Sequence, residues 1–172
     1  MSSPLPAATI QPPPDWHPLP RAAAWVFALG GAMSLLVPAA GASVALGLLV
    51  LRDRGIDVLA ATAGGLLLAA LVVGATTGYR RWRATRWLLD GDALRIRRGL
   101  WWRSESLVPR SRVQHLDLER GPLERQAGLA TLVVFTAGTR MAAVRLPGLG
   151  VDDAEWLRDN LVHDSSDDDD AL

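Results

Sequence analysis

Two uncharged stretches decide the fold: residues 22–51, AAAWVFALGGAMSLLVPAAGASVALGLLVL, and residues 58–79, VLAATAGGLLLAALVVGATTGY. A helix that rises about 1.5 Å per residue needs about 20 apolar residues to cross the roughly 30 Å hydrocarbon core of a bilayer. Each stretch is long enough, and only the short polar segment Arg52–Asp57 separates them. The sequence therefore predicts a transmembrane helical hairpin at residues 22–79, with spans at about 22–44 and 57–79.

The first stretch is longer than one straight, perpendicular helix requires, because residues 22–51 would extend about 45 Å. Two arrangements accommodate the excess length. Pro38 and Gly41 can kink the helix, or the helix can end near Ser43 with the remainder tilted or interfacial. In the second stretch, Gly74 and Gly78 form a small-xxx-small pair, which is either a chance spacing or a close contact within the hairpin.

The arginines around the two stretches predict their orientation. Arg52 and Arg54 lie between the stretches, and five arginines lie outside them: Arg21, Arg80, Arg81, Arg83 and Arg86. Because basic residues favour the cytoplasmic side, we expect a multi-pass protein of the cell membrane with both termini in the cytoplasm. Aromatic residues that prefer the membrane interface flank the same ends: Trp16, Trp25, Tyr79 and Trp82.

Both ends of the chain have compositions typical of disorder. The first 20 residues contain seven prolines, so residues 1–21 are expected to form a disordered arm, either a spacer or a recognition peptide for a proline-binding partner. Residues 164–172 are rich in aspartate and are expected to form a disordered acidic tail. The chain has no cysteine, which excludes disulfides and thiolate metal sites.

Beyond the second stretch, apolar and charged residues alternate, most clearly in Leu94-Arg95-Ile96-Arg97, which is typical of β-strands. We expect strands at Thr85–Leu89, Ala93–Arg97, Leu100–Leu107, Val113–Glu119, Leu129–Thr136 and Arg140–Leu146. Pro147-Gly148 is expected to end the last strand, and Val151–Val162 has the apolar spacing of an amphipathic helix. The predicted class is membrane-anchored α+β, with about six or seven antiparallel strands and a helix over one open end of a barrel.

Several short segments carry a resemblance to a known family: VPRSRVQH at 108–115, GPLER at 121–125, GLA at 128–130, TAG at 136–138, LPGL at 146–149 and DAE at 153–155. In their order and spacing, over roughly Arg80–Leu161, they resemble the bacterial pleckstrin-homology-like (PH-like) membrane proteins of the YdbS type. The resemblance implies a split β-barrel capped by the C-terminal helix, here residues 80–163, on the cytoplasmic side. It implies no catalysis. It also implies a membrane-protein partner such as a larger PH-like relative with repeated domains, and a link to resistance against envelope-active antimicrobials.

Two sets of residues are candidate functional sites. The first is the family motif, whose members bind a ligand or lock loops to the barrel: Pro109, Arg112, Gln114, Gly121, Pro122, Leu123 and Gly128. The second faces lipid, because arginines pair with phosphates and tryptophans favour the headgroup region: Arg95, Arg97, Arg98, Trp101, Trp102 and Arg103. In the alternative for the second set, one tryptophan packs inward and the arginines form a soluble face, since at most one of two adjacent residues in a regular strand is exposed.

The sequence contains no pattern typical of an enzyme or a metal site. Its three histidines, His17, His115 and His163, are far apart, and no nucleophile elbow, phosphate loop or dinucleotide fingerprint occurs. We therefore expect no catalytic activity, cofactor or metal, and no nucleic-acid partner. The predicted function is that of a membrane-anchored interaction module, an adaptor or scaffold for another membrane protein or peptide. The alternative is an anionic-lipid sensor that uses the arginines and tryptophans.

Overall fold

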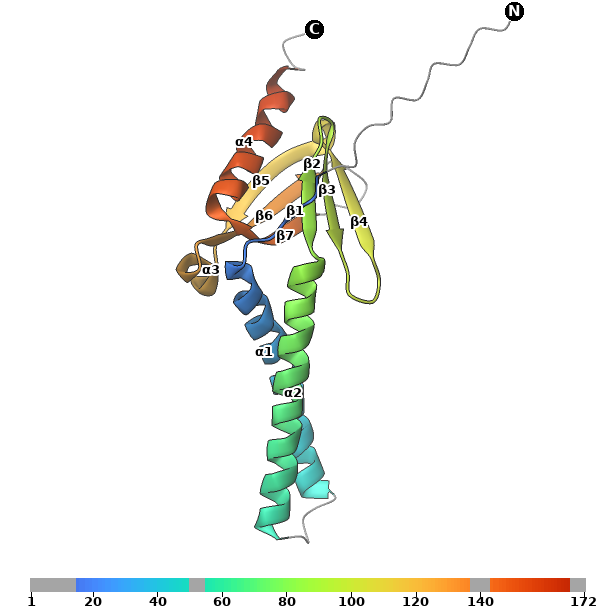
Figure 1. The fold of residues 1–172 in the computed structure, drawn as a ribbon, viewed down its shortest axis with the longest axis vertical. Coiled ribbons are helices and arrows are strands. Elements are labelled where there is room, and N and C mark those ends of the chain that lie inside the picture. Colours follow the sequence, from blue (N-terminus) through green and yellow to red (C-terminus); the bar gives the residue numbers. More distant parts are fainter. Residues whose placement is uncertain (1–14, 50–54, 137–142, 168–172) are drawn as a thin grey trace, which may run out of the picture.

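A computed structural model describes residues 15–49, 55–136 and 143–167 of the chain. Two long helices, α1 (Ala22–Leu49) and α2 (Ile56–Ala84), lie side by side as an antiparallel hairpin. A β-rich domain sits on the end of the hairpin where α1 begins and α2 ends (Figure 1). Of the predicted polar segment Arg52–Asp57, residues 52–54 lie outside the described residues, and Ile56 and Asp57 begin α2.

Both helices are long and apolar enough to cross a membrane. Most of their positions are exposed or half-buried, and the buried positions are Ala23, Ala32 and Gly47 in α1 and Gly74 and Gly78 in α2. The helices extend beyond the predicted spans. In particular, α1 continues through Pro38 to Leu49, so the alternative in which it ends near Ser43 is wrong.

Glycines allow the two helices to approach closely. A Cβ on Gly74 would lie 2.8 Å from Ala32 Cα and would overlap the carbonyl oxygen of Gly31. A Cβ on Gly78 would likewise overlap the carbonyl oxygen of Phe27. The small-xxx-small pair therefore marks a contact within the hairpin, because only glycine leaves room for the facing backbone.

The domain contains two antiparallel sheets. In the first, the order is β1 (His17–Pro18), β2 (Arg86–Leu89), β3 (Ala93–Arg98) and β4 (Ser104–Pro109). A 3₁₀ turn, η1 (Arg110–Arg112), leads into the second sheet, whose order is β5 (Val113–Glu119), β6 (Leu129–Thr136) and β7 (Ala143–Gly150). A short helix, α3 (Pro122–Gln126), connects β5 to β6. The prediction of six or seven antiparallel strands is confirmed.

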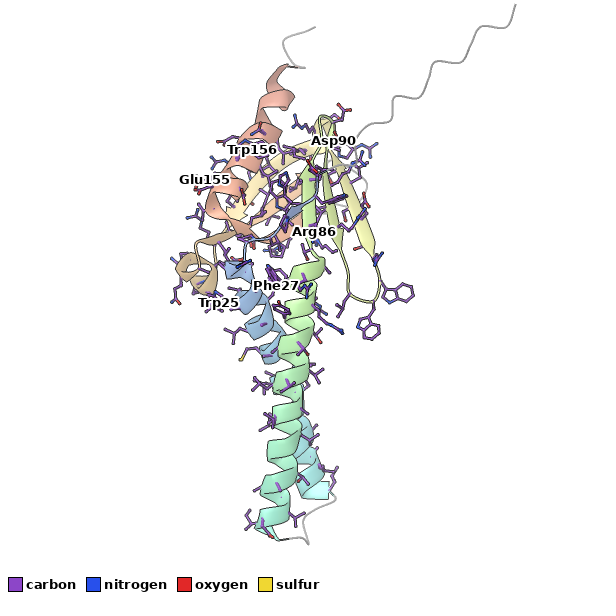
Figure 2. The ribbon with its side chains drawn as sticks, in the orientation of Figure 1. Trp25, Phe27, Arg86, Asp90, Glu155 and Trp156 are labelled. Carbon is purple, nitrogen blue, oxygen red and sulfur yellow. The ribbon has the colours of Figure 1, made fainter. Side chains whose placement is uncertain are left out.

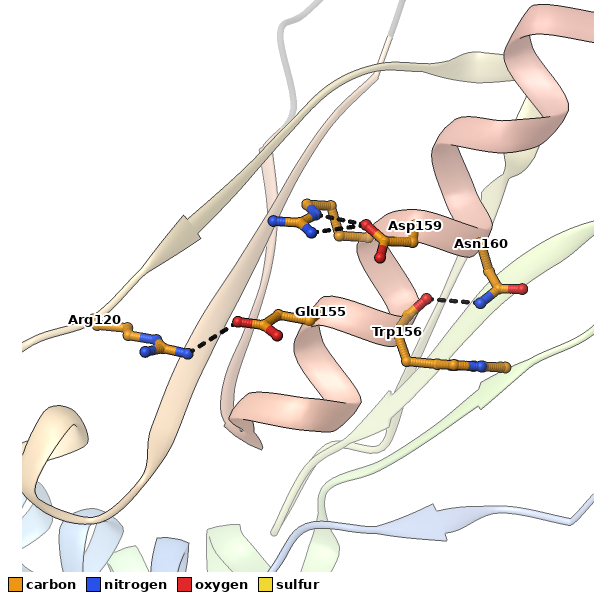
Figure 3. Close-up of polar contacts among 6 residues, drawn as sticks. Arg120, Glu155, Trp156, Asp159 and Asn160 are labelled. Carbon is orange, nitrogen blue, oxygen red and sulfur yellow. Dashed lines mark hydrogen bonds and ion pairs between the residues drawn. The ribbon is translucent and has the colours of Figure 1, made fainter.

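The final helix, α4 (Val151–Asp167), covers the core between the sheets. Leu157 and Leu161 are fully buried there, together with Leu94 of β3 and Leu132 of β6. On its outer side, Glu155 points toward Arg120, which follows β5, and a guanidinium nitrogen of Arg120 lies 3.5 Å from a carboxylate oxygen of Glu155 (Figure 3). Both side chains are exposed, so this ion pair contributes little to stability. The arrangement is that of a PH-like domain, as predicted.

Three predicted boundaries need correction. Strand β4 begins at Ser104 rather than Leu100, because residues 99–103 form a loop. Strand β7 continues through Pro147-Gly148 to Gly150: Leu132 pairs with Leu146 but Ala130 with Leu149, so a β-bulge absorbs one extra residue. Helix α4 extends to Asp167, so the predicted acidic tail is helical at 164–167. Residues 137–142, which include the predicted start of the last strand at Arg140, lie outside the described residues, as do 168–172.

The predicted disordered arm also ends earlier than residue 21, and residues 1–14 lie outside the described residues. Residues His17–Pro18 pair with β2 as strand β1, and Leu19 is only 3% exposed within the domain core. The Trp82 indole donates a hydrogen bond to the Pro20 carbonyl at 3.0 Å. Leu19 and Phe27 also pack against Gly148 of β7. The domain is thus fixed to the hairpin, because its core includes the start of α1.

Candidate functional site

The loop between β3 and β4 presents two adjacent tryptophans to solvent. Trp101 is 86% exposed and Trp102 is 89% exposed. Strand pairing ends at Arg98 and Ser104, and Gly99, with φ of +128°, turns the chain in a conformation that favours glycine. The alternative in which one tryptophan packs inward is wrong, because strand alternation does not apply in a loop.

This loop lies at the end of the domain that faces the hairpin, beside the upper end of α2 (Figure 1). Trp101 and Trp102 line a groove of about 510 Å³ together with Phe27 of α1 and Thr77 of α2. Figure 2 places Phe27 at the upper end of α1, whereas Asp90 lies at the opposite end of the domain. We call this the apolar groove. It connects the exposed tryptophans to the apolar helices.

A second groove, of about 690 Å³, is lined by residues of the same loop, among them Gly99, Leu100 and Arg103. We call it the basic groove, because five arginines from α2, β2, β3 and the loop line it: Arg83, Arg86, Arg97, Arg98 and Arg103. Its lining includes one carboxylate, that of Glu105. The sequence assigned Arg83 and Arg86 only to membrane orientation. Arg83 lies at the end of α2 and Arg86 begins β2, so their place at the junction of helix and strand was the signal that they could reach this site.

The six residues predicted to face lipid do not form one surface. Arg95 pairs with Asp90 at 3.3 Å and lines neither groove. Arg97 pairs with Glu105 at 3.1 Å, and its guanidinium lies 4.3 Å from the centre of the Trp16 ring. This cation–π contact was not predicted, since Trp16 was assigned to a disordered arm. Arg98, Trp101, Trp102 and Arg103 do come together around the loop.

Arg98 is shared by both grooves. It extends from the end of β3 in one sheet to β7 in the other, where it donates a hydrogen bond to the Arg145 carbonyl. Its Nε is buried and has no hydrogen-bond partner among the described residues. Burial lowers the pKa of the Arg98 guanidinium from its ordinary value. Since a desolvated charge is stabilised by a nearby opposite charge, Arg98 favours an anion in the grooves.

The family motif is divided between two places. Pro109 ends β4, and its partner Ala93 follows the turn at Asp90, so this part lies at the end of the domain away from the hairpin. Arg112 and Gln114 are exposed there. The second part, with Gly121, Pro122, Leu123 and Gly128, surrounds α3 beside the start of α1 (Figure 1).

Glu124 holds the α3 turn in place, although the sequence did not single it out. Its carboxylate accepts hydrogen bonds from the Gly121 backbone N–H at 2.9 Å and from the Thr131 hydroxyl at 2.7 Å. The signal was its position three residues after Gly121, the spacing of a capping box. Leu123 is 41% exposed. This half of the motif therefore contains a structural element that links α3 to β6.

Other chemistry is sparse in the described part of the chain. No group of three or more histidine, cysteine, aspartate or glutamate side chains could hold a metal ion among these residues. His115 lies on β5 with its Nε2 2.7 Å from an Asp117 carboxylate oxygen, and both side chains are exposed. The two grooves are therefore the features with the clearest binding chemistry.

Comparisons with known proteins agree with this architecture. The sequence model of the family described as "Bacterial PH domain" matches residues 26–164, which includes most of the hairpin and the whole β-domain after it. The transmembrane protein YdbS of Bacillus subtilis (strain 168) is 32% identical over 81 residues, which cover 47% of this chain and 49% of YdbS. The match thus spans about half the length of that relative. No solved structure matches the chain at a significant level.

Proposed function

We propose that this chain, which belongs to the bacterial PH domain family, is a membrane-anchored module that holds its β3–β4 loop against anionic lipid headgroups. The observation that carries the proposal is the exposure of both tryptophans on that loop, 86% and 89%. Trp side chains favour the headgroup region, where the ring is half in apolar surroundings and the N–H meets water. Exposed in bulk water, two adjacent indoles would form a costly apolar patch.

The position of the loop supports this function. The loop shares the apolar groove with Thr77 and Arg81 of α2. In α2 the apolar run ends at Tyr79 and arginines follow, which is typical of the boundary between hydrocarbon and headgroups. The loop therefore reaches headgroup depth when α2 spans the bilayer. The basic groove beside it supplies arginines that pair with lipid phosphates.

Rigid attachment makes this geometry persistent. Leu19 lies in the domain core, and the Trp82 indole donates a hydrogen bond to the Pro20 carbonyl. The domain is therefore not tethered by a flexible linker. The isolated fragment from Trp82 onward would lack β1 and Leu19. Tests of lipid binding therefore need the full chain.

Loop immersion can be measured directly, because the chain contains no cysteine and a single one can be labelled uniquely. Ser104→Cys places a spin label beside the loop, and Gly91→Cys places a control label on the β2–β3 turn, where a side chain meets open space. Each variant is reconstituted in nanodiscs of phosphatidylcholine with or without phosphatidylglycerol. Electron paramagnetic resonance then compares access of dissolved oxygen with access of a water-soluble nickel chelate.

The expected result is that the label at 104 is accessible to oxygen and protected from the chelate, whereas the label at 91 is accessible to the chelate. Protection at 104 should increase with the anionic lipid and should decrease on Trp101→Ala with Trp102→Ala. Equal chelate access at the two positions in both lipid mixtures would contradict the proposal.

A second candidate function is the docking of another membrane protein, and the edge position of β4 favours it. Among the described strands, β4 pairs only with β3, and Leu107 on it is 57% exposed. A free strand edge can pair with an extended segment of a partner. A photo-crosslinker at Leu107, used in intact membranes, should then give one discrete protein adduct that is absent when the crosslinker is placed at Gly91. The absence of an adduct specific to Leu107 would count against this function.

A further inference from the structure

The basic and apolar grooves are not separate, since Arg98, Gly99 and Leu100 line both. One groove offers guanidinium groups, and the other offers Phe27, Trp101, Trp102 and Pro147. Each groove lies within the volume range of ligand sites, about 300–1,000 Å³. A molecule that fits both must have a strongly anionic end joined to an apolar chain.

The charge of the basic groove indicates how anionic that end must be. Five arginines and one carboxylate line it. Glu105 is already engaged by Arg97 at 3.1 Å. The side chains of Arg83, Arg86 and Arg103 are in no ion pair with the part of the chain that the structure describes, and neither is that of Arg98. A single phosphate would leave most of these charges in mutual repulsion, whereas two phosphates would neutralise them more fully.

The apolar groove indicates where the chain of the ligand lies. It is bounded by the loop on one side and by α1 and α2 on the other, at Phe27 and Thr77. Below these positions the helices present apolar side chains outward, such as Val73 and Leu71. An acyl chain in this groove would thus continue along the hairpin into the hydrocarbon core, so that the ligand need not leave the bilayer.

From this arrangement we infer that the joined grooves form a site for one lipid whose headgroup carries two phosphate groups. Its acyl chain lies between the β3–β4 loop and the hairpin. The inference rests on the proposed function, since the loop must reach headgroup depth for a membrane lipid to enter. It goes further because it predicts that each chain binds one lipid. It also predicts that a single lipid with two phosphates binds more tightly than two lipids with one phosphate each.

The test uses the full chain purified in a mild detergent, with native mass spectrometry to count bound lipids. The probes are cardiolipin, a two-phosphate lipid; phosphatidylglycerol at twice the concentration, which matches the total charge; and inorganic pyrophosphate, which has the phosphates without acyl chains. We expect one cardiolipin per chain, at least tenfold tighter than phosphatidylglycerol, and weaker binding of pyrophosphate.

Variants locate the site. Arg86→Gln with Arg103→Gln removes two exposed guanidinium groups from the basic groove and should weaken cardiolipin binding about 30-fold. The matched control, Arg120→Gln with Arg125→Gln, makes the same charge change at exposed positions outside both grooves and should leave binding within about threefold, an effect of long-range charge alone. Trp101→Ala should weaken cardiolipin binding and leave pyrophosphate binding unchanged.

Several results would overturn the inference. Equal binding of phosphatidylglycerol at matched charge would remove the preference for two phosphates, and equal binding of pyrophosphate would remove the role of the apolar groove. No bound cardiolipin, or equal losses in the site and control variants, would remove the site itself. These outcomes differ from failure of the proposed function, in which the spin label at residue 104 stays in water.

Discussion

Leu19→Ala tests whether the end of the N-terminal segment belongs to the domain core. Leu19 is 3% exposed and packs with Ala23 and Trp87 in the cluster that holds the two sheets together. Replacing a fully buried leucine by alanine costs about 2–5 kcal/mol, because the apolar contacts are lost and a cavity remains. We take about 3 kcal/mol. For a domain of this size each kcal/mol shifts the Tm by about 4–8 °C, so the expected decrease is about 12–24 °C.

The assay is thermal unfolding of the full chain in a mild detergent, followed by near-ultraviolet circular dichroism. Trp87 is 5% exposed and stacks on His17 with ring centres 4.7 Å apart, so its signal depends on the packing around β1. Leu107→Ala is the matched control, since Leu107 is 57% exposed and its loss should change the Tm by no more than about 4 °C. If the Tm of the Leu19→Ala variant equals that of the Leu107→Ala variant, residues 15–20 do not stabilise the domain and the rigid attachment is refuted.

Gly74→Leu should lower the thermal stability of the hairpin in detergent, because its Cβ would overlap the Gly31 carbonyl; Gly64→Leu, in open space, is the control, and equal stability of the two variants would contradict the close crossing. Glu124→Ala should cost about 1–3 kcal/mol and accelerate amide hydrogen exchange at Gly121; unchanged exchange would show that this carboxylate does not hold the turn. A reporter fused after Leu172 should be active in the cytosol, and activity only outside the cell would reverse the predicted orientation.

The fold was largely predictable because its strongest signals are local. A run of about 20 apolar residues and an apolar–charged alternation are read directly along the chain. The strands Val113–Glu119 and Leu129–Thr136 begin and end as predicted. Errors occurred where a local signal has two structural outcomes. Pro147-Gly148 indicates a turn, but here it forms a bulge within β7, where Gly148 adopts a φ of +80° and packs under Phe27.

The candidate site was predicted less well, because its residues come from separate elements. Trp101, Trp102 and Arg103 are adjacent in sequence and were identified together. Arg83 comes from the end of α2 and Phe27 from α1, and no periodicity along the chain indicates that these residues meet. The contact of Trp16 with Arg97 joins positions 81 residues apart, so only the folded chain shows it.

By itself, the sequence determined that this protein has two apolar helices, an antiparallel β-domain and a final amphipathic helix, because hydrophobic periodicity is a property of neighbouring residues. Only the tertiary structure decided that Leu19 and Phe27 complete the domain core and that both tryptophans of the β3–β4 loop face outward. It also decided that arginines from α2, β2, β3 and this loop meet in one groove. Those features depend on how the hairpin and the two sheets pack together, and packing brings together side chains whose separation along the chain carries no signal.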